Sequence, residues 1–273
     1  MKPERARPVF RGIRRALAVA LVALGLAGCA ATPATSNDPS KLVGLWRVSG
    51  VVGESPDTWL LLGDDLVLWT QCGVFQGMWN ARGESFLADV QGGIGERCLF
   101  GQLFDSNSWL TRASGYTETG EGMALVDANG DVVATLTIDG NPPASENYGD
   151  EYTEQPTTEV SFSDPVKLPS GFEPSKDIVG HWVNPEHPDD GTYIEFRGDS
   201  TWAGSDGCNV FRGRYAYGAD GSLLTTVGPM TLMLCEGSAT AELASNASLV
   251  DATKDGLAFY AADGSLEIEV VPG

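Results

Sequence analysis

Histidine is rare in this sequence, and a motif for a catalytic serine is absent. It has only two histidines, His181 and His187, and no G-x-S-x-G motif that would place a nucleophilic serine. No particular pair of carboxylates stands out for glycoside hydrolysis either. We therefore predict that the protein is not an enzyme and has no catalytic residues. A hydrolase that uses His181 or His187 with nearby carboxylates is the less favoured alternative.

Metal-binding patterns are missing as well. Zinc sites use closely spaced pairs of cysteines and redox sites use C-x-x-C, and the sequence contains neither. The run Asn184–Gly191 (NPEHPDDG) gathers His187 with three carboxylates, but a proline-rich polar cluster is more typical of a surface loop. Asp127–Asp131 (DANGD) lacks the spacing and the distal glutamate of a calcium loop, and a hairpin turn explains it better. We predict no metal site.

Basic residues are scarce outside the N-terminal segment. Residues 1–28 hold six basic residues and one acidic residue, so the rest of the chain has 11 Lys and Arg against 36 Asp and Glu, a net charge of −25. Such a surface repels polyanions, which excludes nucleic acid as a partner. No apolar run beyond the N-terminal segment is long enough for a transmembrane helix.

The N-terminal segment reads as a secretory signal. Lys2 and five arginines precede an apolar run from Ala16 to Leu26, which is short for a permanent membrane span. The sequence Leu26-Ala27-Gly28-Cys29 resembles the bacterial lipobox, in which the cysteine is lipidated and becomes the new N-terminus. An ordinary signal peptide with an incidental cysteine is the alternative. We predict a palmitate-bearing lipoprotein held on the cell membrane through Cys29, outside the cytoplasm.

Two parts of the remaining chain repeat each other. Val43–Trp46 (VGLW) matches Val179–Trp182 (VGHW), and the spacing from the tryptophan to the next cysteine is identical in the two copies. Cys72–Trp79 (CGVFQGMW) then matches Cys208–Tyr215 (CNVFRGRY). Fixed order and spacing indicate two copies of one module. The predicted organisation is a signal peptide (1–28), a tether (29–40), module 1 (41–140), a Pro- and acid-rich linker (141–177) and module 2 (178–273).

Many short alternating runs with tight turns predict a mostly β fold. In module 2 we expect strands over residues 193–197, 201–203, 210–217 and 223–227, and one helix over 239–252, with a shorter helix near 106–113 in module 1. Each module is then a curved antiparallel sheet or small partly open barrel with one short helix. Trp46 and Trp182 occupy matching positions and should lie in the cores. Most of the other five tryptophans should pack as well, and some are candidates for lining a groove.

Four cysteines remain after Cys29, two in each module. Disulfides form outside the cytoplasm, and the repeat favours pairing within each copy, Cys72 with Cys98 and Cys208 with Cys235. A disulfide that closes a loop of that size adds roughly 3–4 kcal/mol to the free energy of unfolding in the chain-entropy model. We therefore interpret Cys208, which sits in what looks like a strand, as a structural staple.

Module 2 resembles the META domain family (HslJ-like). The resemblance rests on three elements in order: Phe196–Asp199, then Gly204–Tyr215 with the G-C-N-x-F-x-G-x-Y core, then Thr231–Cys235. Module 1 is a diverged copy, in which Gly73 stands in place of the asparagine. We interpret the motif residues as structural: Gly207, Asn209, Phe211, Gly213, Tyr215, Thr231 and Met233. Asn209 is expected to hydrogen-bond a turn backbone.

The resemblance implies a curved β fold and an envelope lipoprotein from a family linked to stress responses and secretion. It implies no catalytic residues and no cofactor. The favoured hypothesis is a non-enzymatic, membrane-anchored protein that binds an envelope protein or a small ligand under stress. A specific binder of apolar small molecules, with its pocket inside a curved sheet, is the alternative.

Overall fold

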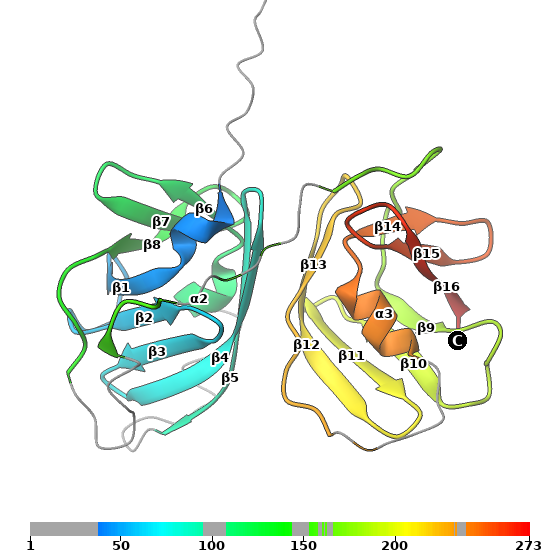
Figure 1. Ribbon diagram of the computed structural model, residues 1–273, viewed down its shortest axis with the longest axis horizontal. Coiled ribbons are helices and arrows are strands. Elements are labelled where there is room, and N and C mark those ends of the chain that lie inside the picture. The colour runs from blue at the N-terminus through cyan, green and yellow to red at the C-terminus, as the bar shows by residue number, and fades with distance from the viewer. Residues whose placement is uncertain are drawn as a thin grey trace, which may run out of the picture. The chain divides into compact units, whose positions relative to one another are not determined.

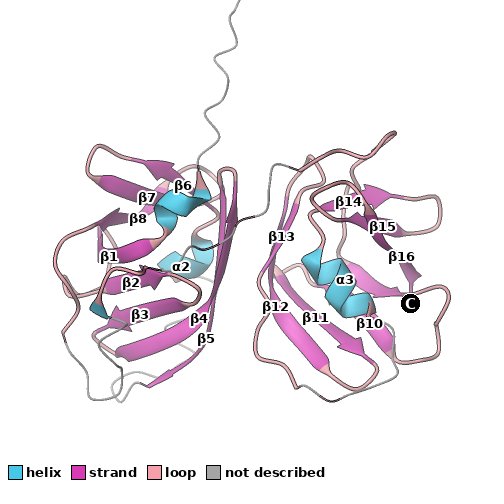
Figure 2. Cartoon of the chain, in the orientation of Figure 1, coloured by secondary structure: helices cyan, strands magenta, loops and turns pink. Residues whose placement is uncertain are grey.

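The computed structural model describes residues 38–94, 108–143, 153–157, 160, 162, 166–231, 233 and 239–273. Within these ranges the chain is mostly β and forms two eight-stranded antiparallel sheets with few helices (Figure 1, Figure 2). The first sheet falls in module 1 and the second in module 2. The predicted fold class is confirmed.

Module 1 is a closed barrel in which each strand pairs with the next along the chain and β8 returns to β1. A single 3-10 turn, Pro39–Leu42, precedes it. Its elements are β1 (Gly44–Ser49), β2 (Trp59–Leu62), β3 (Leu66–Thr70), β4 (Gly73–Arg82), β5 (Ser85–Ile94), α2 (Trp109–Arg112), β6 (Gly115–Glu118), β7 (Gly122–Val126) and β8 (Val132–Thr137).

Module 2 repeats this order, and its first strand again pairs with its last. Its elements are β9 (Gly180–Val183), β10 (Thr192–Phe196), β11 (Thr201–Asp206), β12 (Val210–Tyr217), β13 (Leu223–Thr225), α3 (Thr240–Asn246), β14 (Leu249–Ala252), β15 (Leu257–Tyr260) and β16 (Leu266–Pro272). A bridge between Ser222 and Leu249 joins the two edge strands of this sheet. The same join in module 1 is the pair Ser85 and Gly115, so both modules close at the equivalent place.

The two copies also share their strand register. Trp69 pairs with Val74 in module 1, and Ser205 pairs with Val210 at the same positions of the repeat in module 2. A register shift at Leu125/Val126 recurs at Phe259/Tyr260 in the matching hairpin. Such irregularities set local twist and are difficult to acquire twice. The repeat therefore extends from the sequence motifs to the hydrogen-bonding pattern of the whole module.

The equal spacing from tryptophan to cysteine conceals a difference between the copies. Trp46 pairs with Leu60, whereas Trp182 pairs with Ile194, so the segment that joins these partners is shorter in module 2. The next turn is longer in module 2 and makes up for the difference. In module 1 the last pair before this turn encloses residues 63–65, and in module 2 the corresponding pair encloses residues 197–201. Module 2 therefore has the longer turn after its second strand.

The first strand of each module is anchored by its tryptophan. The indole Nε1 of Trp46 donates to Leu42 O at 2.7 Å, and that of Trp182 donates to Ile178 O at 2.8 Å. Trp46 lies in the barrel core, while Trp182 is half-buried and packs against the core of module 2. The other five tryptophans are buried, and three of them border cavities in the described residues: Trp202 borders a cleft, and Trp79 and Trp109 border smaller cavities.

Two local predictions need correction. The helix expected over 239–252 ends at Asn246, because Leu249–Ala252 forms β14 and the Val250 N–H bonds to Gly221 O at 2.8 Å. Cys208 lies in the turn between β11 and β12, since Asp206 caps the Cys208 and Asn209 N–H groups there. The apolar spacing that suggested a longer helix fits a buried strand equally well.

Described residues of the predicted linker contact both modules. The Gln155 side chain bonds the N–H and the C=O of Leu45, each at 3.0 Å, and Phe162 packs edge-on against Trp79. Further along, Pro174 forms a bridge with Asp251. These parts of the linker therefore add to the packing of the two sheets.

Candidate functional site

The facing walls of the two modules are joined by side-chain hydrogen bonds to backbone carbonyls. From β4, Asn80 Nδ2 donates to Thr225 O at 2.9 Å and Arg82 Nη1 donates to Leu223 O at 3.0 Å. In the other direction, Arg214 on β12 donates to Ala88 O and Thr111 O, both at 3.0 Å. Each module thus supplies donors to the other through the equivalent pair of strands.

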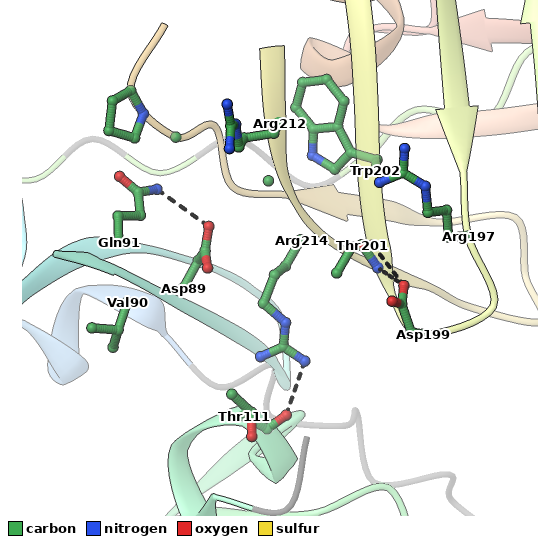
Figure 3. Close-up of a pocket in the computed structure, with 13 residues that line it drawn as sticks. Asp89, Val90, Gln91, Thr111, Arg197, Asp199, Thr201, Trp202, Arg212 and Arg214 are labelled. Carbon is green, nitrogen blue, oxygen red and sulfur yellow. Dashed lines mark hydrogen bonds between the residues drawn. The ribbon is translucent and has the colours of Figure 1, made fainter. Parts of the chain in front are cut away.

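A cleft of about 680 Å³ lies beside these contacts (Figure 3). Module 1 contributes Asp89 and Gln91 from β5 and Thr111 from α2. Module 2 contributes Thr201 from β11, Arg212 and Arg214 from β12, and Arg197 and Asp199 from the turn between β10 and β11. The longer turn of module 2 therefore supplies two of the charged residues of the cleft.

The alternation of β12 explains why its arginines reach the cleft. Phe211, Gly213 and Tyr215 are buried on one face of the strand, so Arg212 and Arg214 project from the other face. A Cβ on Gly213 would lie 1.8 Å from Thr226 O, so only glycine fits between this strand and its neighbour. Gly213 thus allows the close packing under the pair of arginines.

The electrostatics of the cleft are shaped by burial. Burial lowers the pKa of Arg214, and the charges of Asp89 and Asp199 act against that shift. Burial also raises the pKa of Asp89, opposed by the 3.2 Å hydrogen bond from Gln91 Nε2 and by the charge of Arg214. Asp199 has a lowered pKa because its carboxylate accepts from the hydroxyl and the N–H of Thr201 (Figure 3).

The motif residues form a second site within module 2. Asn209 donates to Met233 O at 2.9 Å and accepts from Met233 N–H at 2.8 Å, so its amide pairs with the backbone as a strand would. It also donates to Asp206 Oδ2 at 2.8 Å. A cavity of about 590 Å³ lies here, lined in part by Phe211, Thr231 and Met233.

The remaining motif residues have positions that suit structural roles. Gly207 has φ 95°, which an ordinary side chain rarely adopts. Tyr215 is buried, packs edge-on against Phe196 and donates its hydroxyl to Arg197 O at 2.7 Å. This last bond fixes the start of the turn that carries Arg197 and Asp199 to the cleft.

The cysteine predictions are covered only in part. Cys72 and Cys208 are each disulfide-bonded. Cys29, Cys98 and Cys235 lie outside the described residues, so the pairing within modules and the lipidation of Cys29 stay predictions.

The histidines lie apart from the cleft residues. His181 is on β9 and stacks on Tyr193 with 4.7 Å between ring centroids, and His187 is in the exposed turn before β10. The carboxylate of Asp127 accepts from Asn129 N–H and Asp131 N–H in the β7–β8 hairpin turn, as expected. Among the described residues no group of three or more His, Cys, Asp or Glu is arranged to hold a metal ion.

Sequence reasoning missed the cleft. Arg212 and Arg214 were part of the quoted motif but were not singled out, and nothing in the local sequence of Asp89 and Gln91 distinguishes them. The available signal was the pair of arginines at alternate positions of one strand in a strongly acidic chain.

No helix in the described ranges combines the length and the apolar character needed to cross a membrane. Comparisons of the chain with protein-family models, with curated proteins and with solved structures found no match.

Proposed function

We propose that this protein is a non-enzymatic, membrane-anchored extracytoplasmic lipoprotein with two META-like modules, and that it binds a ligand in the cleft between them in response to envelope stress. The observation that carries the binding role is the cleft itself, because about 680 Å³ lies within the range of small-molecule sites. Donors from both modules converge on it, and ligand sites often form where structural units meet.

The anchor is tested by metabolic labelling. Cells that express the full chain and receive labelled palmitate should incorporate label into the protein, because the lipobox-like sequence ends at Cys29. The Cys29→Ser variant should incorporate none and should leave the membrane fraction. Equal labelling of both proteins would contradict the proposed anchor.

The binding role is tested by a thermal-shift screen of the full chain in detergent. The panel holds organic anions, glycans, peptides, apolar drugs and divalent cations. A compound that binds only the folded protein, at about a hundred times its dissociation constant, should stabilise it by roughly 2.7 kcal/mol. The midpoint of unfolding should therefore rise with the concentration of at least one compound.

A pair of variants assigns that shift to the cleft. Thr201 lines the cleft, and Thr201→Trp should abolish the shift because the indole fills the space. Thr117→Trp, at an exposed threonine of β6, should keep it. A flat panel would contradict small-molecule binding and direct the search to a protein partner, and a shift that survives Thr201→Trp would place the site elsewhere.

An apolar ligand in the second cavity is the alternative. Met230 and Met233 are 44% and 55% exposed and border that cavity with Phe211. Flexible thioether side chains adapt to apolar ligands of different shapes. Apolar hits whose shift survives Thr201→Trp would favour this site.

A further inference from the structure

The charge of the cleft differs from that of the chain. The protein has a formal net charge of −20, yet Arg197, Arg212 and Arg214 all line this one cleft. Arg197 is paired with Glu195, with 2.6 Å between Nη2 and Oε2. Within the described parts of the chain, neither Arg212 nor Arg214 forms an ion pair. In these parts, two arginines of the cleft therefore have no carboxylate in direct contact.

Arg212 and Arg214 lie on the same face of one strand. They lie at alternate positions on the same face of β12, so their Cα atoms are separated by about 7 Å. A guanidinium has five N–H donors in a rigid fork that matches carboxylate and phosphate oxygens. Arg214 donates two bonds to carbonyls of module 1, and the other donors of its guanidinium engage no described residue. Arg212 is exposed, and its guanidinium makes no hydrogen bond to the described residues.

The acidic groups of the cleft form no direct ion pair with Arg212 or Arg214 among the described residues. Asp199 is occupied by two hydrogen bonds from Thr201, at 3.0 Å from the N–H and 2.6 Å from the hydroxyl. Asp89 accepts from Gln91 through Oδ2 only. Its other oxygen leaves an acceptor for a hydroxyl or ammonium group of a ligand.

We infer that the cleft binds a small organic oxyanion, a molecule with a carboxylate, sulfate or phosphate group, and that Arg212 and Arg214 hold that group. This inference rests on the proposed function, because it names the ligand class of the same cleft. Arg214 also donates to Ala88 O and Thr111 O, so an anion bound to it is linked to both modules. Anion binding is thereby coupled to the contact between the modules.

The test is calorimetric titration of the full chain in detergent with citrate and with inorganic pyrophosphate, at constant ionic strength. Sorbitol serves as an uncharged probe. At least one of the two anions should bind saturably, and sorbitol should not bind. Arg212→Ala should weaken that binding about tenfold or more, because it removes a charge-assisted hydrogen bond. Arg212→Lys should restore only part of the affinity.

Lys254→Ala is the matched control. It removes one positive charge from a side chain that is 92% exposed and does not line the cleft, so anion affinity should not change. Equal weakening in Lys254→Ala and Arg212→Ala would overturn the inference, because only the net charge would matter.

Failure of the inference is distinguishable from failure of the proposed function. If neither anion binds while a neutral or cationic compound of the screen still shifts unfolding and loses that shift in Thr201→Trp, only the ligand class is wrong. If neither anion binds and the whole screen is flat, the proposed binding function fails as well.

Discussion

Replacing Gly213 with alanine is expected to lower the free energy of unfolding by about 3–5 kcal/mol. The added Cβ would lie 1.8 Å from Thr226 O and 2.8 Å from Trp202 Nε1. The indole of Trp202 is fully buried and donates to the same carbonyl at 3.0 Å. Relief of the clash must therefore move β12 from its neighbour or break a buried hydrogen bond. Urea unfolding followed by circular dichroism measures the loss.

Gly198→Ala is the matched control for this prediction. Gly198 lies in the turn between β10 and β11, and a Cβ there would meet nothing within 4 Å. The free energy of unfolding of the Gly198→Ala protein should stay close to that of the wild type. Gly77 is the module 1 counterpart of Gly213, and its Cβ would lie 2.1 Å from Asp89 O, so Gly77→Ala should also be costly. A Gly213→Ala protein as stable as Gly198→Ala would refute the close packing of β12.

Loss of the disulfide at Cys208 is expected to have the second largest effect. Cys208 is disulfide-bonded in the turn that also holds Asn209. If its partner is Cys235, as the repeat predicts, the closed loop contributes roughly 3–4 kcal/mol under oxidising conditions. Cys208→Ala should lower the unfolding midpoint accordingly. Adding a reductant to the wild type should produce at least as large a loss, because it also breaks the disulfide at Cys72.

The pairing itself is measured by mass spectrometry of a non-reduced proteolytic digest. A peptide pair that joins Cys208 to Cys235, and another that joins Cys72 to Cys98, is the expected result. The double variant Cys208→Ala with Cys235→Ala should be no less stable than Cys208→Ala alone, since both lack the same bond. An unchanged unfolding midpoint in Cys208→Ala would contradict the structural interpretation of this cysteine.

The fold was accessible from the sequence because local signals and the repeat agree. Alternating runs with Asp-Gly turns predicted the strands, and Val210–Tyr217 is a strand with the expected bounds. The prediction that the helix continues beyond Asn246 was wrong, because an apolar residue such as Val250 suits a buried position in a helix and in a strand. Long-range pairing distinguishes the strand from the helix, through the β14–β15 ladder and the bond from Val250 N–H to Gly221 O.

The cleft was not accessible in the same way. It depends on contacts between residues far apart in the sequence, such as Arg214 and Ala88. The spacing of apolar and polar residues along the chain gives no information about such contacts. The equal spacing from tryptophan to cysteine in the two copies also masked the longer turn that brings Arg197 and Asp199 to the cleft. The part of module 2 that differs from module 1 therefore contributes to its candidate site.

The shared register of the two modules has a consequence for folding. Val48 pairs with Leu136 and Val183 pairs with Val271, so in each copy the first strand gains its second partner only when the last strand has been made. Such non-local pairing slows folding, and unpaired edges are exposed while a chain emerges during synthesis. Since β1 and β9 accept the last strand in the same manner, an early β9 meets a competing partner in β8. Closure of module 1 before β9 is made would remove this competition between the two copies.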